Sequence, residues 1–184
     1  MLHIGNKRAL FLRLSTALAL WCIASFVLAN EGGTQGGISA HYGMGSHYRR
    51  ATLNYETPAL WSYALSGNGG RLDLTGELGV SYWQAEGSRS PNNVWQFNAI
   101  PMFRWWVGER FYIEGGIGAT ALTATRFADK RLGSAFQFGD HIGLGFLLTP
   151  QSRVGLRYSH FSNGNIKQPN PGLNVTQVTY TYQF

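Results

Sequence analysis

Hydrophobic and polar residues alternate over long stretches of this chain. In residues 71–85 one set of alternate positions is apolar and the intervening set is mostly polar. The apolar set comprises Leu72, Leu74, Leu78, Val80 and Tyr82. The same period of two recurs in residues 94–106 and 110–123. Because successive side chains of a β-strand point to opposite faces, this period predicts strands with one apolar and one polar face.

Short segments rich in turn-forming residues separate the alternating stretches, at 66–70, 90–93, 108–110 and 149–152. These boundaries predict eight strands, near residues 36–45, 50–63, 71–85, 94–106, 110–123, 134–148, 153–163 and 173–184. Strands usually have about five or six residues, and these are longer. A tilted strand that crosses a bilayer needs about 9–11 residues. The lengths therefore predict an all-β fold, an eight-stranded antiparallel transmembrane β-barrel with short periplasmic turns.

The composition also favours lipid as the solvent of this barrel. Charged residues make up 13% of the chain, whereas an average soluble domain has about 25%. Several charges of the predicted strands fall on the polar parity, where we expect them to pair inside the barrel: Glu56, Asp73, Glu77, Arg104, Glu114 and Arg157. Trp61, Tyr63, Trp95 and Trp105 near strand ends fit aromatic girdles. The alternation that ends in Phe184 resembles the C-terminal signature of bacterial outer-membrane β-barrels. The alternative, a soluble lipocalin-like barrel, would place the apolar parity inside.

Residues 1–29 have the organisation of a secretory signal peptide, with basic residues before an apolar stretch that ends in small residues. The apolar stretch 14–29 is shorter than the roughly 20 residues of a spanning helix, which is the alternative interpretation. The single cysteine, Cys22, lies in this stretch, so the predicted barrel at 30–184 suits an oxidising periplasm. Without the signal cations, 12 basic residues face 9 acidic ones. The remaining net charge of +3 does not support nucleic-acid binding.

Polar residues interrupt the lipid-facing parity at the outer ends of the last two predicted strands. In 153–163 this parity continues from Tyr158 to His160 and Ser162, and in 173–184 it begins at Asn174. Polar side chains that face hydrocarbon are costly, so they indicate a function. Residues i and i+2 of a strand have Cα atoms about 6.6 Å apart, which lets an imidazole reach a hydroxyl. A neutral histidine can then accept the serine proton as the oxygen attacks a carbonyl.

The segment His160-Phe161-Ser162-Asn163-Gly164-Asn165-Ile166-Lys167-Gln168-Pro169-Asn170-Pro171-Gly172 closely resembles the hallmark of the PagL family of lipid A 3-O-deacylases. Residues 136–140 extend this similarity. The resemblance implies an eight-stranded barrel in the outer membrane of a Gram-negative bacterium, with lipid A or lipopolysaccharide as its partner. It also implies hydrolysis of the ester-linked hydroxyacyl chain at position 3 of lipid A, without a metal or other cofactor. In this resemblance His160 is the base and Ser162 is the nucleophile.

Asn174 stands where the best-known members of the family have a glutamate. An amide oxygen can accept the imidazole N–H and fix the tautomer, but it cannot stabilise the imidazolium by charge. Asp140 is the alternative partner of His160, because folding about the 150–151 turn brings it level with residues 160–162. The competing interpretation of Asp140 is a structural carboxylate inside the barrel. An impaired site is the third possibility.

A serine esterase also needs hydrogen-bond donors for the oxyanion. The candidates are Asn163, Asn165 and Asn170 with the 163–165 backbone, although these residues also suit a simple turn. In the outer loops Lys167, Arg126, Lys130 and Arg131 are candidates to bind lipid A phosphates, or are simply solvated. We expect structural roles for the inward-facing His41 and His141 and a solvated His47 in a short loop.

Two further functions compete with ester hydrolysis. The first is a non-enzymatic small barrel with a decayed site, which would bind lipopolysaccharide or a partner through its loops. The second is acyl transfer to another acceptor, which would use the same nucleophile as hydrolysis. The sequence does not separate transfer from hydrolysis.

Overall fold

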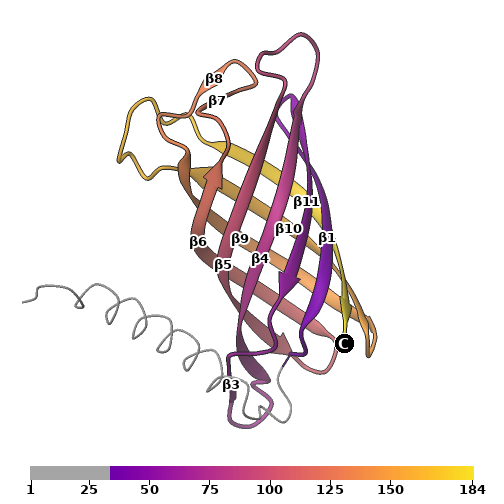
Figure 1. Ribbon diagram of the computed structural model, residues 1–184. Coiled ribbons are helices and arrows are strands. Elements are labelled where there is room, and N and C mark those ends of the chain that lie inside the picture. Colours follow the sequence, from indigo (N-terminus) through magenta and orange to yellow (C-terminus); the bar gives the residue numbers. More distant parts are fainter. Residues whose placement is uncertain (1–33) are drawn as a thin grey trace, which may run out of the picture. The chain divides into compact units, whose positions relative to one another are not determined.

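The computed structural model describes residues 34–184, so the predicted signal peptide lies outside the described residues. Eight long strands form a barrel (Figure 1): β1 (Gly37–Gly45), β2 (Tyr48–Glu56), β4 (Arg71–Ala85), β5 (Asn93–Val107), β6 (Phe111–Leu122), β9 (Phe136–Thr149), β10 (Ser152–Ser162) and β11 (Leu173–Gln183). Three short strands accompany them: β3 (Trp61–Ala64), β7 (Arg126–Phe127) and β8 (Lys130–Arg131).

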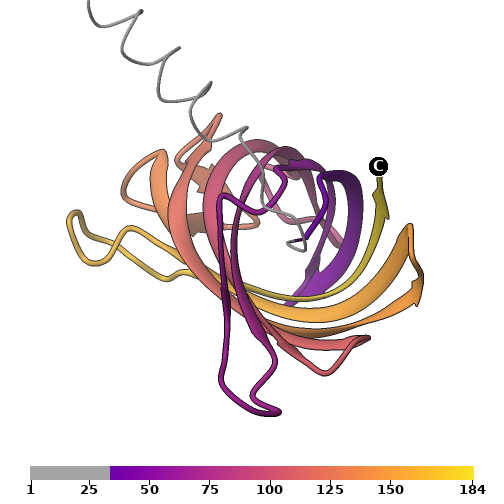
Figure 2. The same cartoon turned by 90° about the horizontal axis from the view of Figure 1, so that it is seen from below.

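The long strands make one closed antiparallel sheet. Each pairs with the next long strand along the chain, and β1 pairs with β11 to close the circle. Figure 2 views this barrel from below, with the strands surrounding a common interior. The predicted eight-stranded antiparallel barrel is confirmed.

The predicted strand 50–63 is divided in two, because β2 ends at Glu56 and β3 begins at Trp61. Pro58 lies between them and has no N–H to donate to a ladder. The preceding Thr57 N–H donates instead to the Gly76 carbonyl at 2.8 Å. The connection 57–70 at the lower end in Figure 1 is therefore long and carries β3, whereas the other two connections at that end span only 108–110 and 150–151.

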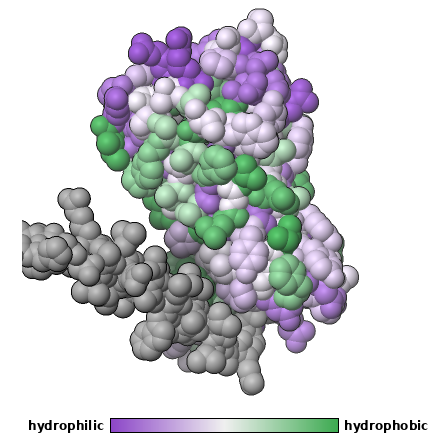
Figure 3. Space-filling model, viewed as in Figure 1, coloured by the Kyte–Doolittle hydropathy of each residue, from purple (hydrophilic) through white to green (hydrophobic). Residues whose placement is uncertain are grey.

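Apolar side chains cover the outer wall of the barrel, and polar ones fill its interior. Exposed outward residues include Leu78, Phe97, Ile142 and Val178, with exposed fractions between 53% and 62%. Figure 3 shows hydrophobic residues across the middle of the molecule and hydrophilic ones at its upper end. This arrangement is opposite to that of a lipocalin-like barrel, and it identifies the apolar parity as the lipid-facing one. No helix within residues 34–184 is both long and apolar enough to cross a membrane.

The predicted interior charges are paired with one another. Arg104 bonds to Glu56 and Glu114, Arg157 bonds to Glu77 and Glu114, and Arg153 bonds to Glu56. All six side chains are at most 4% exposed. The sixth predicted charge of the interior, Asp73, is also fully buried and accepts from Arg71 at 2.9 Å. A small barrel is filled by its side chains, and pairing satisfies charges that would be costly alone.

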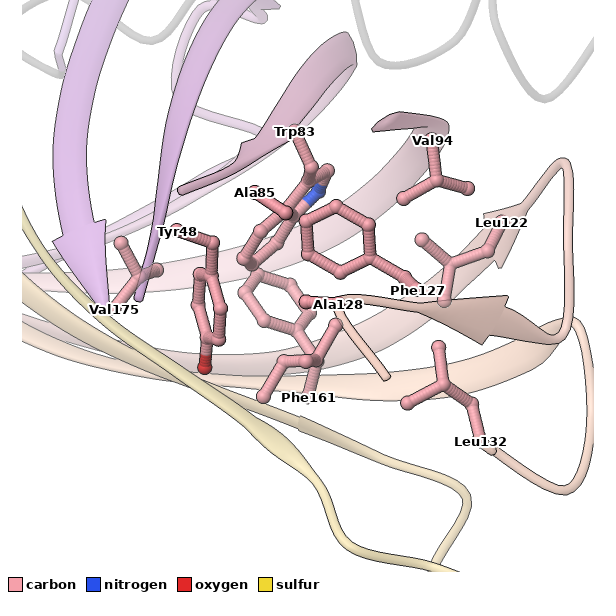
Figure 4. Packing of buried hydrophobic residues seen from close by; sticks show 11 residues of the cluster. Tyr48, Trp83, Ala85, Val94, Leu122, Phe127, Ala128, Leu132, Phe161 and Val175 are labelled. Carbon is pink, nitrogen blue, oxygen red and sulfur yellow. The ribbon is translucent and has the colours of Figure 1, made fainter. Parts of the chain in front are cut away.

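A hydrophobic cluster fills the upper end of the barrel, where the long connections 86–92, 123–135 and 163–172 lie, whereas 57–70 is the long connection at the lower end (Figure 1, Figure 4). Its members are Tyr48, Trp83, Ala85, Val94, Leu122, Phe127, Ala128, Leu132, Phe161, Leu173 and Val175. Phe127 and Ala128 come from the β7–β8 hairpin, which the alternation did not predict because each of its strands has only two residues. In outer-membrane barrels the longer loops are extracellular, so this end faces outward from the cell.

Candidate active site

The sheet register brings His160, Asn174 and Asp140 into one row across three neighbouring strands. His160 on β10 lies opposite Asn174 on β11 and opposite Asp140 on β9. The row sits at the upper end of β10, because only Phe161 and Ser162 follow His160 in this strand. The pairing thus places both candidate partners of His160 directly beside it.

Alternation fixes the outward direction of these side chains. Phe161, which follows His160, and Leu173 and Val175, which flank Asn174, are buried in the hydrophobic cluster. Their neighbours along each strand must point to the opposite face of the sheet. His160, Ser162 and Asn174 are accordingly half-buried or exposed on the outer wall. The hydrophobic cluster therefore holds the polar site on the lipid-facing surface.

His160 and Asn174 form a short hydrogen bond on this surface. The His160 Nδ1 atom lies 2.5 Å from Asn174 Oδ1. Because an amide oxygen only accepts, Nδ1 carries the proton and donates it, and Nε2 is left as the free basic nitrogen. This is the orientation that a general base requires.

Ser162 lies two residues beyond His160 on the same face and is half-buried. Within residues 34–184 its hydroxyl makes no hydrogen bond, and His160 bonds to Asn174 alone. The Cα atoms of residues at this spacing are about 6.6 Å apart, which is within reach of a rotated imidazole. Catalytic hydrogen bonds are often long before substrate binds and tighten in the complex.

Asp140 faces outward, so its interpretation as an interior carboxylate is wrong. It is half-buried on the outer wall, whereas its neighbour His141 is inward and 9% exposed. The alternation predicts this outward direction, because adjacent residues of a strand point to opposite faces and His141 was assigned to the inward face. Asp140 and His160 line the same groove, and within residues 34–184 the Asp140 carboxylate has no hydrogen-bond partner.

The three candidate oxyanion asparagines are bonded mainly to their own loop. The Asn163 amide is fully buried and donates to the carbonyls of Leu132 and Lys167, at 3.1 and 2.7 Å. Asn170 accepts from the Asn163 N–H at 3.0 Å, and its amide donates to Asn165 Oδ1 at 3.2 Å. These side chains therefore shape the 163–172 loop. The Asn163 amide uses both of its N–H donors within the protein, whereas the Asn170 amide uses only one.

Two backbone donors of this loop remain available. Gly164 and Asn165 have φ values of +61° and +63°, and the Ile166 N–H closes the turn onto the Asn163 carbonyl at 3.1 Å. This is the pattern of a type I′ turn, in which both central residues have positive φ. The N–H groups of these two residues have no partner within residues 34–184. Donors of this kind can stabilise an oxyanion beside Ser162.

The outer-loop cations divide into two kinds. Arg126, Arg131 and Lys167 are exposed, as phosphate ligands would have to be. Lys130 is half-buried and donates to the Gly172 carbonyl at 3.2 Å. Partial burial holds the pKa of the Lys130 ammonium below its usual value. We therefore interpret Lys130 as a structural residue that links the β7–β8 hairpin to the loop beside His160, and not as a phosphate ligand.

A groove on the outer wall starts at the site, and sequence reasoning missed it. It has a volume of about 570 Å³ and extends from His160 and Asp140 over Gly115 to Phe103. A second hollow of about 300 Å³ shares Gly115 and continues to Trp105. In the next row of the sheet Tyr158, Ile142 and Phe103 are large, and Gly115 leaves the gap between Ile142 and Phe103. A strand glycine often marks the close approach of a ligand, and that was the available signal.

The other three histidines of residues 34–184 lie where the sequence predicted them. His41 and His141 are buried inside the barrel, and His141 Nδ1 lies 2.7 Å from the Ser159 hydroxyl. His47 is exposed in the β1–β2 turn. Within residues 34–184 no group of three or more histidine, cysteine, aspartate or glutamate side chains is arranged to hold a metal.

The fold and this site define a class of small outer-membrane β-barrels that carry a cluster of polar side chains on the lipid-facing wall, near the extracellular end. A family model described as lipid A 3-O-deacylase (PagL) matches residues 33–183. The chain therefore belongs to the PagL family, and its barrel is an integral protein of the outer membrane.

Individual relatives agree with this assignment. A lipid A deacylase PagL of Bordetella bronchiseptica is 75% identical over 151 residues, which cover 82% of this chain and 85% of that protein. A lipid A deacylase PagL of Pseudomonas aeruginosa is 33% identical over 113 residues, covering 60% and 65%. The crystal structure of the outer membrane enzyme PagL superposes with a TM-score of 0.68 and 29% identity, and covers 80% of this chain and 99% of that one.

Proposed function

We propose that this protein is a lipid A 3-O-deacylase that hydrolyses the ester-linked 3-hydroxyacyl chain at position 3 of lipid A. The observation that carries the proposal is the hydrogen bond from His160 to Asn174 on the lipid-facing wall, beside Ser162. An ester of an outer-leaflet lipid lies at this depth, where a polar pair has no structural use. The family membership and the names of the relatives support the same substrate.

The first half of the reaction forms an acyl-enzyme. His160 Nε2 accepts the Ser162 proton while the serine oxygen attacks the ester carbonyl carbon. The Gly164 and Asn165 N–H groups stabilise the negative charge on the carbonyl oxygen, an effect often worth about 3–4 kcal/mol. The bond from that carbon to the sugar oxygen then breaks, and His160 returns the proton to the sugar oxygen.

The second half releases the acyl chain. Water gives a proton to His160 and attacks the carbonyl carbon of the Ser162 ester. The bond from that carbon to the serine oxygen breaks, and the serine regains its proton from His160. The products are a free 3-hydroxy fatty acid and lipid A with a free hydroxyl at position 3.

Mass spectrometry of lipid A incubated with the purified barrel tests the proposal. We expect lipid A to lose the mass of one hydroxyacyl chain and a free hydroxy fatty acid to accumulate. Release of no chain, in detergent and in outer membranes, would favour the non-enzymatic barrel. Appearance of the chain on another acceptor instead of as free acid would favour acyl transfer.

We expect Asn174→Ala to lower kcat by about 10²-fold, because His160 then loses the acceptor that fixes its tautomer. Asp140→Asn should cost less, since within residues 34–184 the Asp140 carboxylate is not bonded to His160. Initial rates of fatty acid release from lipid A micelles give both values. A larger loss in Asp140→Asn would assign the supporting role to Asp140.

We propose that the groove over Gly115 binds the acyl chain that is cleaved. It leads from His160 across the next row of the sheet, away from the extracellular end, which is the direction in which acyl chains enter the bilayer. The backbone does not require glycine at position 115. A Cβ there would meet only the His141 carbonyl oxygen at 3.5 Å, which is an ordinary contact.

Gly115→Leu is therefore expected to fill the groove without damage to the barrel. A displaced acyl chain shifts the ester relative to Ser162, and a displacement of about 1 Å can cost about 10²-fold in rate. We expect this loss in kcat/KM for a long-chain 3-hydroxyacyl ester, and no change for a short-chain ester that ends before Gly115. Gly115→Ala is the matched control with near-normal rates. Equal losses for both esters in Gly115→Leu would show that the groove does not hold the chain.

A further inference from the structure

Tyr48 reaches across the inside of the barrel to the backbone of Asn174. It begins β2, is 1% exposed, and belongs to the hydrophobic cluster. Its hydroxyl accepts from the Asn174 N–H at 2.9 Å and donates to the Asn174 carbonyl at 3.1 Å. Figure 4 shows the hydroxyl of Tyr48 turned toward the ribbons of the last strands. One side chain thus satisfies both main-chain groups of a single residue.

These two bonds take the place of a missing strand partner. The ladder between β1 and β11 extends only to the pair of Met44 with Thr176, two residues short of Asn174. Without another partner the Asn174 N–H and carbonyl would be unpaired beside a buried cluster, and such groups cost free energy. Tyr48 lies on β2, on the other side of β1 from β11, and its hydroxyl supplies the missing partner of both groups.

Gly45 makes this crossing possible. It lies on β1, opposite Tyr48 in the β1–β2 pairing. A Cβ at position 45 would lie 2.1 Å from Tyr48 Cε2 and 2.4 Å from the Asn174 carbonyl oxygen. Any side chain there must displace the tyrosine ring or the β11 backbone.

The ring of Tyr48 is itself fixed on several sides. Trp83 and Phe127 pack against it with ring centroids 5.6 Å away. Lys130 Nζ lies 5.8 Å from the ring centroid while it donates to the Gly172 carbonyl. The hydroxyl therefore has a defined position from which to hold β11.

The position of the Asn174 backbone decides the geometry of the active site. Its N–H and carbonyl point toward Tyr48 and away from β10, so Asn174 and His160 form a non-hydrogen-bonded pair. In such pairs the side chains of opposite residues lie closest. A shift of Asn174 at the start of β11 would move Oδ1 away from His160 Nδ1.

We propose that Tyr48 is a positioning residue of the active site, which acts through Asn174 to hold the His160 imidazole in its reactive tautomer. Tyr48 is inside the barrel and His160, Ser162 and Asn174 are outside, so Tyr48 does not touch the substrate. The expected effect of Tyr48 on kcat rests on the proposed function.

The kinetic experiment compares wild type, Tyr48→Phe, Asn174→Ala and the double variant in lipid A micelles, with rates divided by the folded fraction. Tyr48→Phe is expected to lower kcat about tenfold with KM unchanged, because substrate binding does not use the tautomer. In the Asn174→Ala background Tyr48→Phe should lower kcat no further, because the Asn174 side chain through which Tyr48 acts on His160 is already absent. Gly45→Ala should reproduce the loss of Tyr48→Phe. Tyr112→Phe, a buried tyrosine inside the same barrel, is the matched control with normal kcat.

A second measurement does not depend on activity. In a barrel labelled with ¹⁵N-histidine, the signals of His160, assigned by their loss in His160→Asn, are expected to report the Nδ1–H tautomer in wild type and a mixture in Tyr48→Phe. Multiplicative kinetic losses in the double variant, or an unchanged tautomer in Tyr48→Phe, would overturn the inference. Inactive wild type with the expected change of tautomer would refute only the proposed function.

Discussion

Ser162→Ala is expected to abolish release of the hydroxyacyl chain from lipid A. Removal of a serine nucleophile leaves only the contributions of oxyanion stabilisation and substrate binding, so we expect a loss of at least about 10³-fold in kcat. His160→Asn should have an effect of similar size, and the double variant should lose little more, because base and nucleophile act as a unit. The mass of lipid A after incubation measures all three variants.

Ser152→Ala is the matched control for this experiment. Ser152 lies on the same strand and the same face as Ser162, but at the opposite end of β10. Its hydroxyl is 3.0 Å from that of Tyr180, far from the His160 row. Its removal should leave deacylation unchanged. If Ser162→Ala retained the wild-type rate, another group would have to be the nucleophile, and the mechanism given above would be abandoned.

Arg157→Met is expected to produce the largest loss of stability. The guanidinium of Arg157 makes two hydrogen bonds to Glu77 and two to Glu114, with distances between 2.6 and 2.8 Å. The variant leaves two buried carboxylates without this partner. Breaking a buried ion pair from one side typically costs about 3–5 kcal/mol. Urea unfolding followed by tryptophan fluorescence should show this decrease in the free energy of unfolding.

Arg110→Met provides the comparison for this stability measurement. Arg110 is exposed in the connection between β5 and β6 and makes no ion pair within residues 34–184. We expect a change below about 0.5 kcal/mol for this variant. Equal free energies of unfolding in the two variants would mean that the interior charges are stabilised in some other way. The folded fraction of Arg157→Met should still deacylate lipid A, because Arg157 lies inside the barrel.

Several features of the fold and the site were predictable because they depend on period two alone. The alternation in β4, β5 and β6 predicted which face of each strand is apolar. The same rule predicted that His160, Ser162 and Asn174 share the outer face and that the charged residues share the interior. The rule also implies that Asp140 lies on the outer face, because Asp140 is the neighbour of the inward-facing His141.

Other features depend on contacts between segments that are distant in the sequence. The side-chain bonds of Asn163 and Asn170 arise when residues 163–172 fold back on themselves and on Leu132. Lys130 is tied to Gly172 because the β7–β8 hairpin packs on the hydrophobic cluster. Amino-acid type alone gives the same potential donors whether a loop uses them internally or offers them to a ligand.

By itself, the sequence determined the number of long strands, the direction in which each side chain points, and which polar side chains lie on the outer face near the upper end of the barrel. These follow from local backbone geometry, in which each residue's face is set by its neighbours. Only the tertiary structure decided the hydrogen bond that joins His160 to Asn174 and leaves Asp140 unbonded, the gap above Gly115, and the reach of Tyr48 past Gly45. The physical reason is that each of these depends on distances across the closed sheet, which hydrogen bonding between strands establishes and no local pattern encodes.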